Sequence, residues 1–594
     1  MTTSAGTSRA PASGVRAYLR SQWWVLAWVL VLALLYLGPA LGQGFVLSYD
    51  MVFVPQQSLL LTTFGLDGGL PRAVPQDIVV ALLTQVVDGA WVQKVVLLAI
   101  PIVAGLGVAR LLMGWGRGVQ LMGVTLAVWN PFVVERMVIG HWALLLTYAV
   151  VPWVLACLMR LRNTGRGAPG LLLWCALGSL VPTGGVWLLM VVSVPLLWPG
   201  GVLTLKRRIT FMSGVVALNL PWLLAALAHP SRGTTRIDGS EAFALRAEGT
   251  WGEVLTALSL GGIWNSEVVL PSRGLILAPI MGVLLIGLTV WGIRSWMRVG
   301  ERVVVVWGVL LAGAGAVLAL LPALLTGLWG LLLETLPGGG LLRDSHKWLL
   351  LLAMVVAIVA PIGAARLIRP ISDSVNRRVI VAALVIAPVL VLPDMAWGAS
   401  GRLSAVEYPT EWTNMRQAVA EQQITGDVIV LPWSTFRRFE FNANRTVLDP
   451  APRWLPRASV FSSSLAVTRG GQTIVISGDD PRSQVVNETL AAGQPLVGVA
   501  SDLGVGLALV ERNARPPVPA TALDGTSLVW SEGNLELYRF PGPARAPFVT
   551  AADRVIIGVN IVIAIGLVGL GLTAAGGRWR SRRSNSLIDP DSPA

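Results

Sequence analysis

The sequence predicts a polytopic α-helical membrane protein of about twelve transmembrane helices, with a small extracytoplasmic α/β domain inserted before the last helix. Two observations predict this class. Hydrophobic residues make up 54% of the 594 residues, whereas charged residues make up only 13%. Apolar runs that approach the ~20 residues needed to cross a bilayer also recur along the chain. This hydrophobic content is higher than the core of a soluble protein requires.

The apolar runs divide the chain into its parts. They occupy residues 23–42, 92–113, 119–132, 143–159, 170–181, 186–198, 209–227, 275–293, 303–321, 348–367, 379–393 and 554–575. The first run is long and no small-residue cleavage site follows it, so we expect a retained helix rather than a removed signal peptide. The expected parts are an N-terminal tail at 1–22, a transmembrane domain at 23–393, a soluble α/β domain at 394–550, a last helix at 551–575 and a C-terminal tail at 576–594.

Basic residues predict the orientation in the membrane. If the N-terminus is cytoplasmic, every inner connection carries cations, such as Arg110, Arg160, Lys206, Arg298 and Arg378, whereas the short outer loops carry fewer. The positive-inside rule then places both termini in the cytoplasm, and we expect a multi-pass protein of the plasma membrane. The net charge of +13 is explained by orientation and by contact with membrane lipid, so it does not indicate a nucleic-acid partner.

The segment from 394 to 550 has a different character. Charged residues, prolines, glycines and short alternating apolar strings replace the long runs there. We expect strands at 427–432, 472–477 and 496–500 and a helix at 483–492. These elements predict a small α/β domain on the outer face.

Two further segments are amphipathic, at 76–87 and 326–336. Both are too short or too polar to span a bilayer, so we expect them to lie flat at the interface and to roof a cavity that opens outward. The alternative for each is a loop that rests against the lipid headgroups.

Titratable residues gather in three short segments on the expected outer side. Asp50 comes soon after the first apolar run, where a carboxylate is costly unless it is solvated or used. All three histidines, His141, His229 and His346, are expected on that side. The other two segments contribute Glu135, Arg136 and His141 in one loop and Arg343, Asp344, His346 and Lys347 in the other. Together they offer a base and several cations suited to a phosphate leaving group.

Each of these residues also has a structural explanation. Arg136, Arg343 and Lys347 could extend to the lipid headgroups, and Asp344 could form an ion pair with Arg343 or Lys347. Asp50 could be a solvated loop carboxylate, although its apolar neighbours would partly bury it.

No cofactor is certain from the sequence. It contains no Walker loop, no dinucleotide fingerprint in a strand-turn-helix setting and no zinc-ligand spacing. Asp67, Asp77 and Asp88 share the outer loop after Asp50 and leave a divalent cation as an option, but their spacing matches no dedicated metal loop. Because there is no nucleotide pool outside the cell, an activated donor must arrive there attached to a lipid.

Three stretches carry a resemblance to a known family. They are 48–59 (SYDMVFVPQQSL), 124–153 (VTLAVWNPFVVERMVIGHWALLLTYAVVPW) and 341–348 (LLRDSHKW). With an acidic residue and a flat helix in the first outer loop, the chain resembles the GT-C class of polyprenyl-phosphate-sugar glycosyltransferases. Within this class it is most similar to the actinobacterial cell-wall α-(1→3)-arabinofuranosyltransferase family. It is shorter than the large members and lacks their extended sugar-binding C-terminal region, so the resemblance does not imply the acceptor.

The resemblance implies roles for individual residues. Asp50 would be the catalytic base that takes a proton from an acceptor hydroxyl in an inverting transfer. The donor phosphate would be bound by Arg343, His346, Lys347 and Arg136. Substrate-binding or supporting roles would fall to Tyr49, Glu135, His141, Asp344 and Gln56.

The resulting expectation is a membrane glycosyltransferase that acts on the outer face. Its partners would be a polyprenyl-phosphate donor carrying arabinofuranose or mannose, a cell-envelope glycan or glycolipid acceptor, and membrane lipid. One alternative is a transporter or flippase of a lipid-linked saccharide, which many spans and Gly/Pro-interrupted helices favour. That alternative lacks the charged pairs within spans that coupled transport needs. Another is a non-catalytic envelope assembly protein whose domain at 394–550 binds other components.

Overall fold

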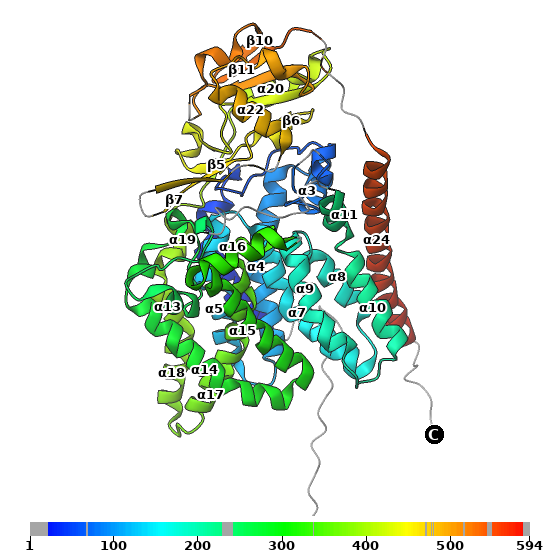
Figure 1. The fold of residues 1–594 in the computed structure, drawn as a ribbon. Helices are drawn as coiled ribbons and strands as arrows, with labels where there is room; N and C mark the ends of the chain where they lie inside the picture. The colour runs from blue at the N-terminus through cyan, green and yellow to red at the C-terminus, as the bar shows by residue number, and fades with distance from the viewer. Residues whose placement is uncertain are drawn as a thin grey trace, which may run out of the picture.

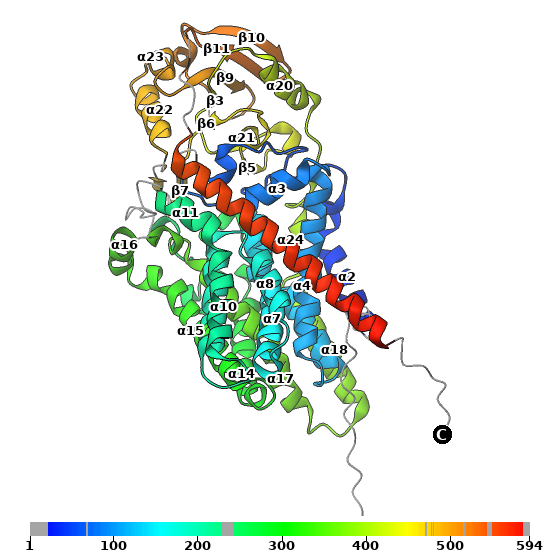
Figure 2. The same ribbon diagram turned by 90° about the vertical axis from the view of Figure 1, so that its right-hand side faces the viewer.

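The computed structural model describes residues 22–66, 69–228, 241–336, 338–469, 472–476, 478, 480–514, 517–542, 544 and 549–585. A bundle of long helices carries a smaller α/β unit at one end (Figure 1). We call this end of the bundle the domain side. The last helix, α24 (Ala551–Asn585), returns from the α/β unit and crosses the outside of the bundle, where it contacts α8 and α11 (Figure 2).

Within the described residues, nine helices are long and apolar enough to span a membrane. The spans cover Trp23–Leu41, Gly89–Leu111, Arg117–Val138, Trp142–Thr164, Leu277–Val299, Arg302–Leu324, Ser345–Ile368, Ser374–Val391 and Ala551–Leu572. A tenth span results if α10 (Leu205–Ala217) and α11 (Leu220–Ala228), which meet at 57°, count as one.

Among the described residues the count is therefore nine or ten spans, and the predicted number of about twelve is not confirmed. Each apolar run falls largely within one helix or a consecutive pair of helices, but two of the runs form single helices too short to span. They are α8 (Ala168–Gly178), with 11 residues, and α9 (Pro182–Leu197), with 16 residues. At 1.5 Å per residue, neither helix alone crosses a hydrocarbon layer of about 30 Å.

The remaining helices of the bundle are formed by the other apolar runs and by segments between the runs. Their bounds are α2 (Trp23–Leu37), α3 (Gln76–Thr84), α4 (Gly89–Leu111), α5 (Arg117–Val128), α6 (Pro131–Val138), α7 (Trp142–Thr164), α13 (Gly252–Leu258), α14 (Leu277–Val299), α15 (Arg302–Leu324), α16 (Thr326–Thr335), α17 (Leu350–Ile368), α18 (Ser374–Val391) and α19 (Ala396–Ser400). Helix α17 is apolar all round and lies in the centre, with 94% of its span buried. Helices α3 and α16 form within the two segments expected to be amphipathic.

One break in the bundle positions the site. The span Arg117–Val138 consists of α5 and α6, which are interrupted at Asn130. The Asn130 side chain caps α6 by accepting a hydrogen bond of 3.0 Å from the Val133 amide, and Pro131 occupies the first helical position. The short helix α6 thereby carries Glu135 and Arg136 toward the domain side.

The α/β unit is built on a five-stranded sheet of order β10-β11-β9-β3-β6. Strands β9, β3 and β6 run parallel, and β10, β11 and β9 run antiparallel. The strands are β3 (Asp427–Leu431), β6 (Ser459–Val460), β9 (Val505–Glu511), β10 (Ser527–Glu532) and β11 (Leu535–Arg539), and the helices are α20 (Thr410–Glu421), α21 (Ala451–Trp454), α22 (Pro481–Ala491) and α23 (Val497–Ala500).

Side-chain alternation on β3 divides the core of this unit. Val428 and Val430 belong to the large core shared with the bundle, whereas Ile429 and Leu431 face a second core with α22 and α23. The strand predicted at 496–500 is wrong, because this segment forms helix α23. A short apolar run does not distinguish a strand from a buried helical turn.

Two hairpins lie where the α/β unit meets the bundle. They are β4 (Phe436–Arg438) with β5 (Thr446–Leu448), and β7 (Leu465–Arg469) with β8 (Gln472–Ile476). The first hairpin continues into the bundle through the backbone of Tyr49, whose amide donates to Thr446 and whose carbonyl accepts from Leu448, each at 2.8 Å. Strand β1 (Phe45–Val46) pairs in addition with β2 (Ala405–Val406). The α/β unit is thus attached directly to the segment that carries Asp50.

Candidate active site

Asp50 lies in a tight turn on the domain side. The Met51 amide donates to the Ser48 carbonyl at 2.8 Å, and the Asp50 amide donates to the Ile139 carbonyl at 3.1 Å. Gly140 permits this close approach, since its φ is +91° and an added Cβ would lie 2.0 Å from the Met51 nitrogen. The sequence therefore fixes the Asp50 turn against the end of α6.

A chain of hydrogen bonds orients the Asp50 carboxylate. His141 Nε2 lies 3.0 Å from Asp50 Oδ2, and His141 Nδ1 lies 2.8 Å from Arg136 Nη1. A guanidinium only donates, so Nδ1 accepts and the ring proton lies on Nε2, from which it is donated to Asp50. Arg136 thereby selects the tautomer of His141 that supports the carboxylate.

Arg136 is the centre of a buried network. It forms two hydrogen bonds to Asp344, from Nη1 to Oδ2 at 2.6 Å and from Nη2 to Oδ1 at 2.8 Å. Its Nη2 also lies 2.9 Å from His346 Nδ1. Arg136 and His346 are both 0% exposed. Packing encloses both residues, and Arg136 already donates to Asp344 and both histidines. That Arg136 and His346 bind the donor phosphate stays a prediction.

Charge in this network acts on the titratable groups around it. Burial pushes the pKa of Asp50 upward, but the hydrogen bond from His141 and the charges of Lys347 and Arg453 outweigh it, so the pKa lies below its usual range. Burial lowers the pKa of His141, and the nearby cations lower it further. Although burial opposes ionisation, Arg136 and Lys347 hold the pKa of Asp344 far below its usual value. At neutral pH, Asp50 is therefore ionised and His141 is neutral.

Two cations of the predicted cluster keep access to solvent. The side chain of Lys347 is 25% exposed, with Nζ 3.7 Å from Asp344 Oδ2. Arg343 is partly buried, and its guanidinium lies 4.2 Å from the ring centre of Phe243. Both are partly exposed, whereas Arg136 is enclosed.

The α/β unit adds a cation that the sequence analysis did not single out. Arg453, in α21, lies close enough to lower the pKa of Asp50, and it pairs with Asp77 at 3.4 Å. Among the described residues, its buried Nε has no hydrogen-bond partner. No local pattern marks Arg453, since its segment is more than 350 residues away from Asp77 and the two meet only in the fold.

A second buried layer lies beneath His346. Glu135 is 0% exposed; its Oε2 lies 3.5 Å from His346 Nε2 and accepts from the Ile263 amide at 3.3 Å. Glu248 and Arg273 form a buried ion pair of 2.7 Å next to it. Glu135 is thus enclosed, and its supporting role stays a prediction. No local pattern marks Glu248, because its partners Gly262, Arg273 and Glu135 come from other segments of the chain.

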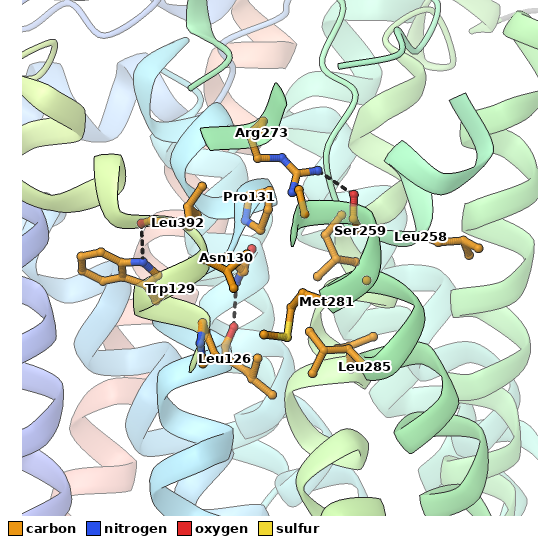
Figure 3. A pocket seen from close by; sticks show the side chains of 16 residues that line it. Leu126, Trp129, Asn130, Pro131, Leu258, Ser259, Arg273, Met281, Leu285 and Leu392 are labelled. Carbon is orange, nitrogen blue, oxygen red and sulfur yellow. Dashed lines mark hydrogen bonds between the residues drawn. The ribbon is translucent and has the colours of Figure 1, made fainter. Parts of the chain in front are cut away.

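A cavity of about 40 Å³ lies below Arg273, between the α5–α6 break, α13, α14 and α18 (Figure 3). Arg273 donates to Ser259 at 2.6 Å at its upper edge, and Trp129 donates to the Leu392 carbonyl at 2.9 Å at its side. This volume accommodates little more than water, so the cavity is too small for a prenyl chain.

The other predicted residues have different positions. Gln56 donates to Gln85 at 2.8 Å, and its carbonyl accepts from Arg416 at 2.8 Å. Within the described residues no hydrogen bond joins it to Asp50 or His141. Asp88 caps α4 by accepting from the Ala90 amide at 2.8 Å. His229 and Asp67 lie outside the described residues. In the part of the chain that the structure describes, no group of three or more His, Cys, Asp or Glu side chains is arranged to hold a metal ion.

The fold is that of a polytopic helical membrane protein. It is similar to the cryo-EM structure of the arabinofuranosyltransferase AftD from Mycobacteria, with a TM-score of 0.58 and 16% identity over 88% of this chain and 40% of that chain. A mutant structure of AftD gives a TM-score of 0.55 and 15% identity, over 88% of this chain and 42% of that one. The predicted likeness in fold is thereby confirmed. The chain spans about two fifths of the length of AftD.

No family model matches the sequence, and no curated protein matches it.

Proposed function

We propose that this protein is a GT-C glycosyltransferase that transfers a sugar from a polyprenyl phosphate to a saccharide acceptor. The observation that carries the proposal is the ionised, partly exposed Asp50 carboxylate, which His141 orients and which lies near Lys347 and Arg453. A base beside cations at one end of a membrane bundle suits a reaction in which a lipid phosphate departs. The similarity of the fold to AftD supports the same reaction class.

The chemistry follows from these groups. Asp50 takes the proton of an acceptor hydroxyl, and the acceptor oxygen forms a bond to the anomeric carbon of the donor sugar. The bond from that carbon to the phosphate oxygen breaks, and the polyprenyl phosphate leaves with the electron pair. Attack opposite to the departing phosphate gives inversion through an oxocarbenium-like transition state.

Lys347, Arg343 and Arg453 are the groups that offset the growing charge on the phosphate. Lys347 and Arg453 both act electrostatically on Asp50, so they lie near the reacting centre. Arg136 serves by holding His141 and Asp344 in place. Charge stabilisation of this kind is commonly the largest contribution to catalysis.

The domain side is assigned to the extracytoplasmic face. Helix α7 begins next to His141 on the domain side and ends beyond Arg160 and Arg162, and α4 likewise ends next to Arg110. The cations at these far ends suit the cytoplasmic face. The active site then opens outside the plasma membrane, where a lipid-linked donor is the available form of activated sugar.

The test uses membranes that contain the full chain or its Asp50→Asn variant. They are incubated with synthetic polyprenyl-phosphate arabinofuranose or mannose and a saccharide acceptor, and consumption of donor and formation of product are measured. We expect one of the two donors to be consumed by the native chain and neither by Asp50→Asn, with equal amounts of folded protein. Equal transfer by both proteins, or no consumption of either donor, would overturn the proposal.

A further inference from the structure

A polar cluster lies beside Asp50, where the bundle meets the hairpin of β4 and β5. The Tyr49 hydroxyl donates to Glu267 Oε2 at 2.5 Å, and Arg438 Nη2 lies 3.7 Å from Glu267 Oε1. Arg438 Nε also donates to Thr446 Oγ1 at 3.1 Å. Asn265 lies next to the same phenol. We call these five residues the seam cluster, since Asn265 and Glu267 belong to the bundle whereas Arg438 and Thr446 belong to the α/β unit.

The seam cluster is open to solvent. The side chains of Glu267 and Arg438 are 59% and 56% exposed, and their separation of 3.7 Å leaves hydrogen-bonding capacity on both. An exposed ion pair of this kind adds little to stability, so stability does not explain why the two charges meet here. Tyr49 adds an aromatic surface, with its ring centre 6.1 Å from that of Phe436.

The backbone of Tyr49 is held in an unusual conformation. Its φ of +47° lies in the left-handed region that non-glycine residues rarely adopt. The two backbone hydrogen bonds to β5 maintain this conformation. Strained residues of this kind gather at functional sites, and this one directly precedes the proposed base. The strain presents the phenol to Glu267 while Asp50 faces His141.

The chemistry of the cluster suits a neutral polyol. A carboxylate accepts hydrogen bonds from sugar hydroxyls, a guanidinium and an amide donate to them, and an aromatic ring packs on the apolar face of a sugar. Glu267 and Arg438 cancel in charge, and the carboxylate disfavours a second anion. A phosphate or a lipid headgroup is therefore better suited to Lys347 and Arg453 than to this cluster.

We propose that the seam cluster binds the acceptor saccharide and so brings its reactive hydroxyl to Asp50. This inference rests on the proposed function, and it assigns Glu267 and Arg438 to acceptor binding. The α/β unit then takes part in acceptor choice through β4 and β5. The donor phosphate is then left to the cations Lys347 and Arg453, which act on Asp50.

The first test measures binding without donor. The full chain in detergent is titrated with methyl glycosides of arabinofuranose and mannose oligosaccharides, and saturation-transfer NMR reports contact. We expect Glu267→Gln and Arg438→Gln to weaken binding at least tenfold. Arg512→Gln is the matched control, because Arg512 has a similarly exposed side chain and pairs with Glu536 elsewhere in the α/β unit. Unchanged binding by both seam variants, or no binding by the native chain, would overturn the inference.

The second test separates acceptor binding from a structural role. In the transfer assay, we expect the seam variants to raise the acceptor KM at least tenfold and to leave the donor KM within twofold of the native value. An equal rise in both constants, or a loss of thermal stability that Arg512→Gln does not share, would contradict acceptor binding. If no donor is consumed but the seam variants still lose oligosaccharide binding, the proposed reaction fails while the saccharide site remains.

Discussion

Arg136 and Asp344 form a buried ion pair with two hydrogen bonds, although they are 208 residues apart in the sequence. Their side chains are 0% and 8% exposed. Removing two such charges from water costs free energy. Good alignment of the two ions and hydrogen bonds from them to other groups offset this cost. Here the further bonds go to His141 and His346. The pair therefore links α6 to the start of the α17 span and fixes the ring that supports Asp50.

Removal of one charge of this pair is expected to destabilise the protein. In Asp344→Ala the Arg136 guanidinium stays buried and loses its counter-charge, which costs about 3–5 kcal/mol in comparable pairs. The measurement is thermal unfolding of the detergent-solubilised chain. Glu301→Ala serves as a control, since it removes a carboxylate that pairs with Arg162 but is 20% exposed. An Asp344→Ala variant as stable as the native chain would show that the pair does not hold these segments together.

His141 is expected to set the pH dependence of transfer. Burial raises the pKa of Asp50, and the hydrogen bond from His141 is the largest effect that lowers it. A base works only when ionised, so loss of this bond in His141→Ala raises the pKa of Asp50 and moves the acid limb of the pH–rate profile to higher pH. His141→Gln keeps an amide N–H near the position of Nε2 and is expected to shift the limb less. Identical acid limbs in all three proteins would exclude this role.

Lys347 is expected to act on the departing phosphate. Lys347→Met keeps the apolar part of the side chain but removes its charge. We expect kcat/KM to fall about 100- to 1,000-fold, which is the usual effect of removing one hydrogen-bond donor to an anion that develops in the transition state. The control is Lys206→Met. Lys206 is exposed at the start of α10. This part of α10 lies beside the last turn of α7, and that turn is on the order of 30 Å from His141. Steady-state transfer by both variants is the measurement, and equal rates would remove Lys347 from the site.

Local patterns predicted the helices better than the site. The apolar runs became helices because run length and composition act locally, and the break at Asn130 is marked by a capping residue followed by Pro131. Three titratable segments meet around Asp50, as the sequence analysis expected. Sequence could not tell which cations are enclosed, because burial of Arg136 depends on packing between distant segments. For the same reason it missed Arg453, which the α/β unit brings to the site.

Gly140 tests whether the turn of Asp50 must pack tightly on α6. Gly140→Ala introduces strain at a φ of +91° and places a Cβ 2.0 Å from the Met51 nitrogen, so the turn must move. Gly114 is the matched control, because its φ of +97° imposes similar strain but no described atom lies within 4 Å of an added Cβ. Gly114→Ala is expected to cost about 1–2 kcal/mol and to keep activity. Gly140→Ala is expected to cost more and to lose most transfer, since a displaced turn separates Asp50 from His141. Thermal unfolding and transfer assays on both variants decide the matter, and equal behaviour would show that the close approach at Gly140 is not required.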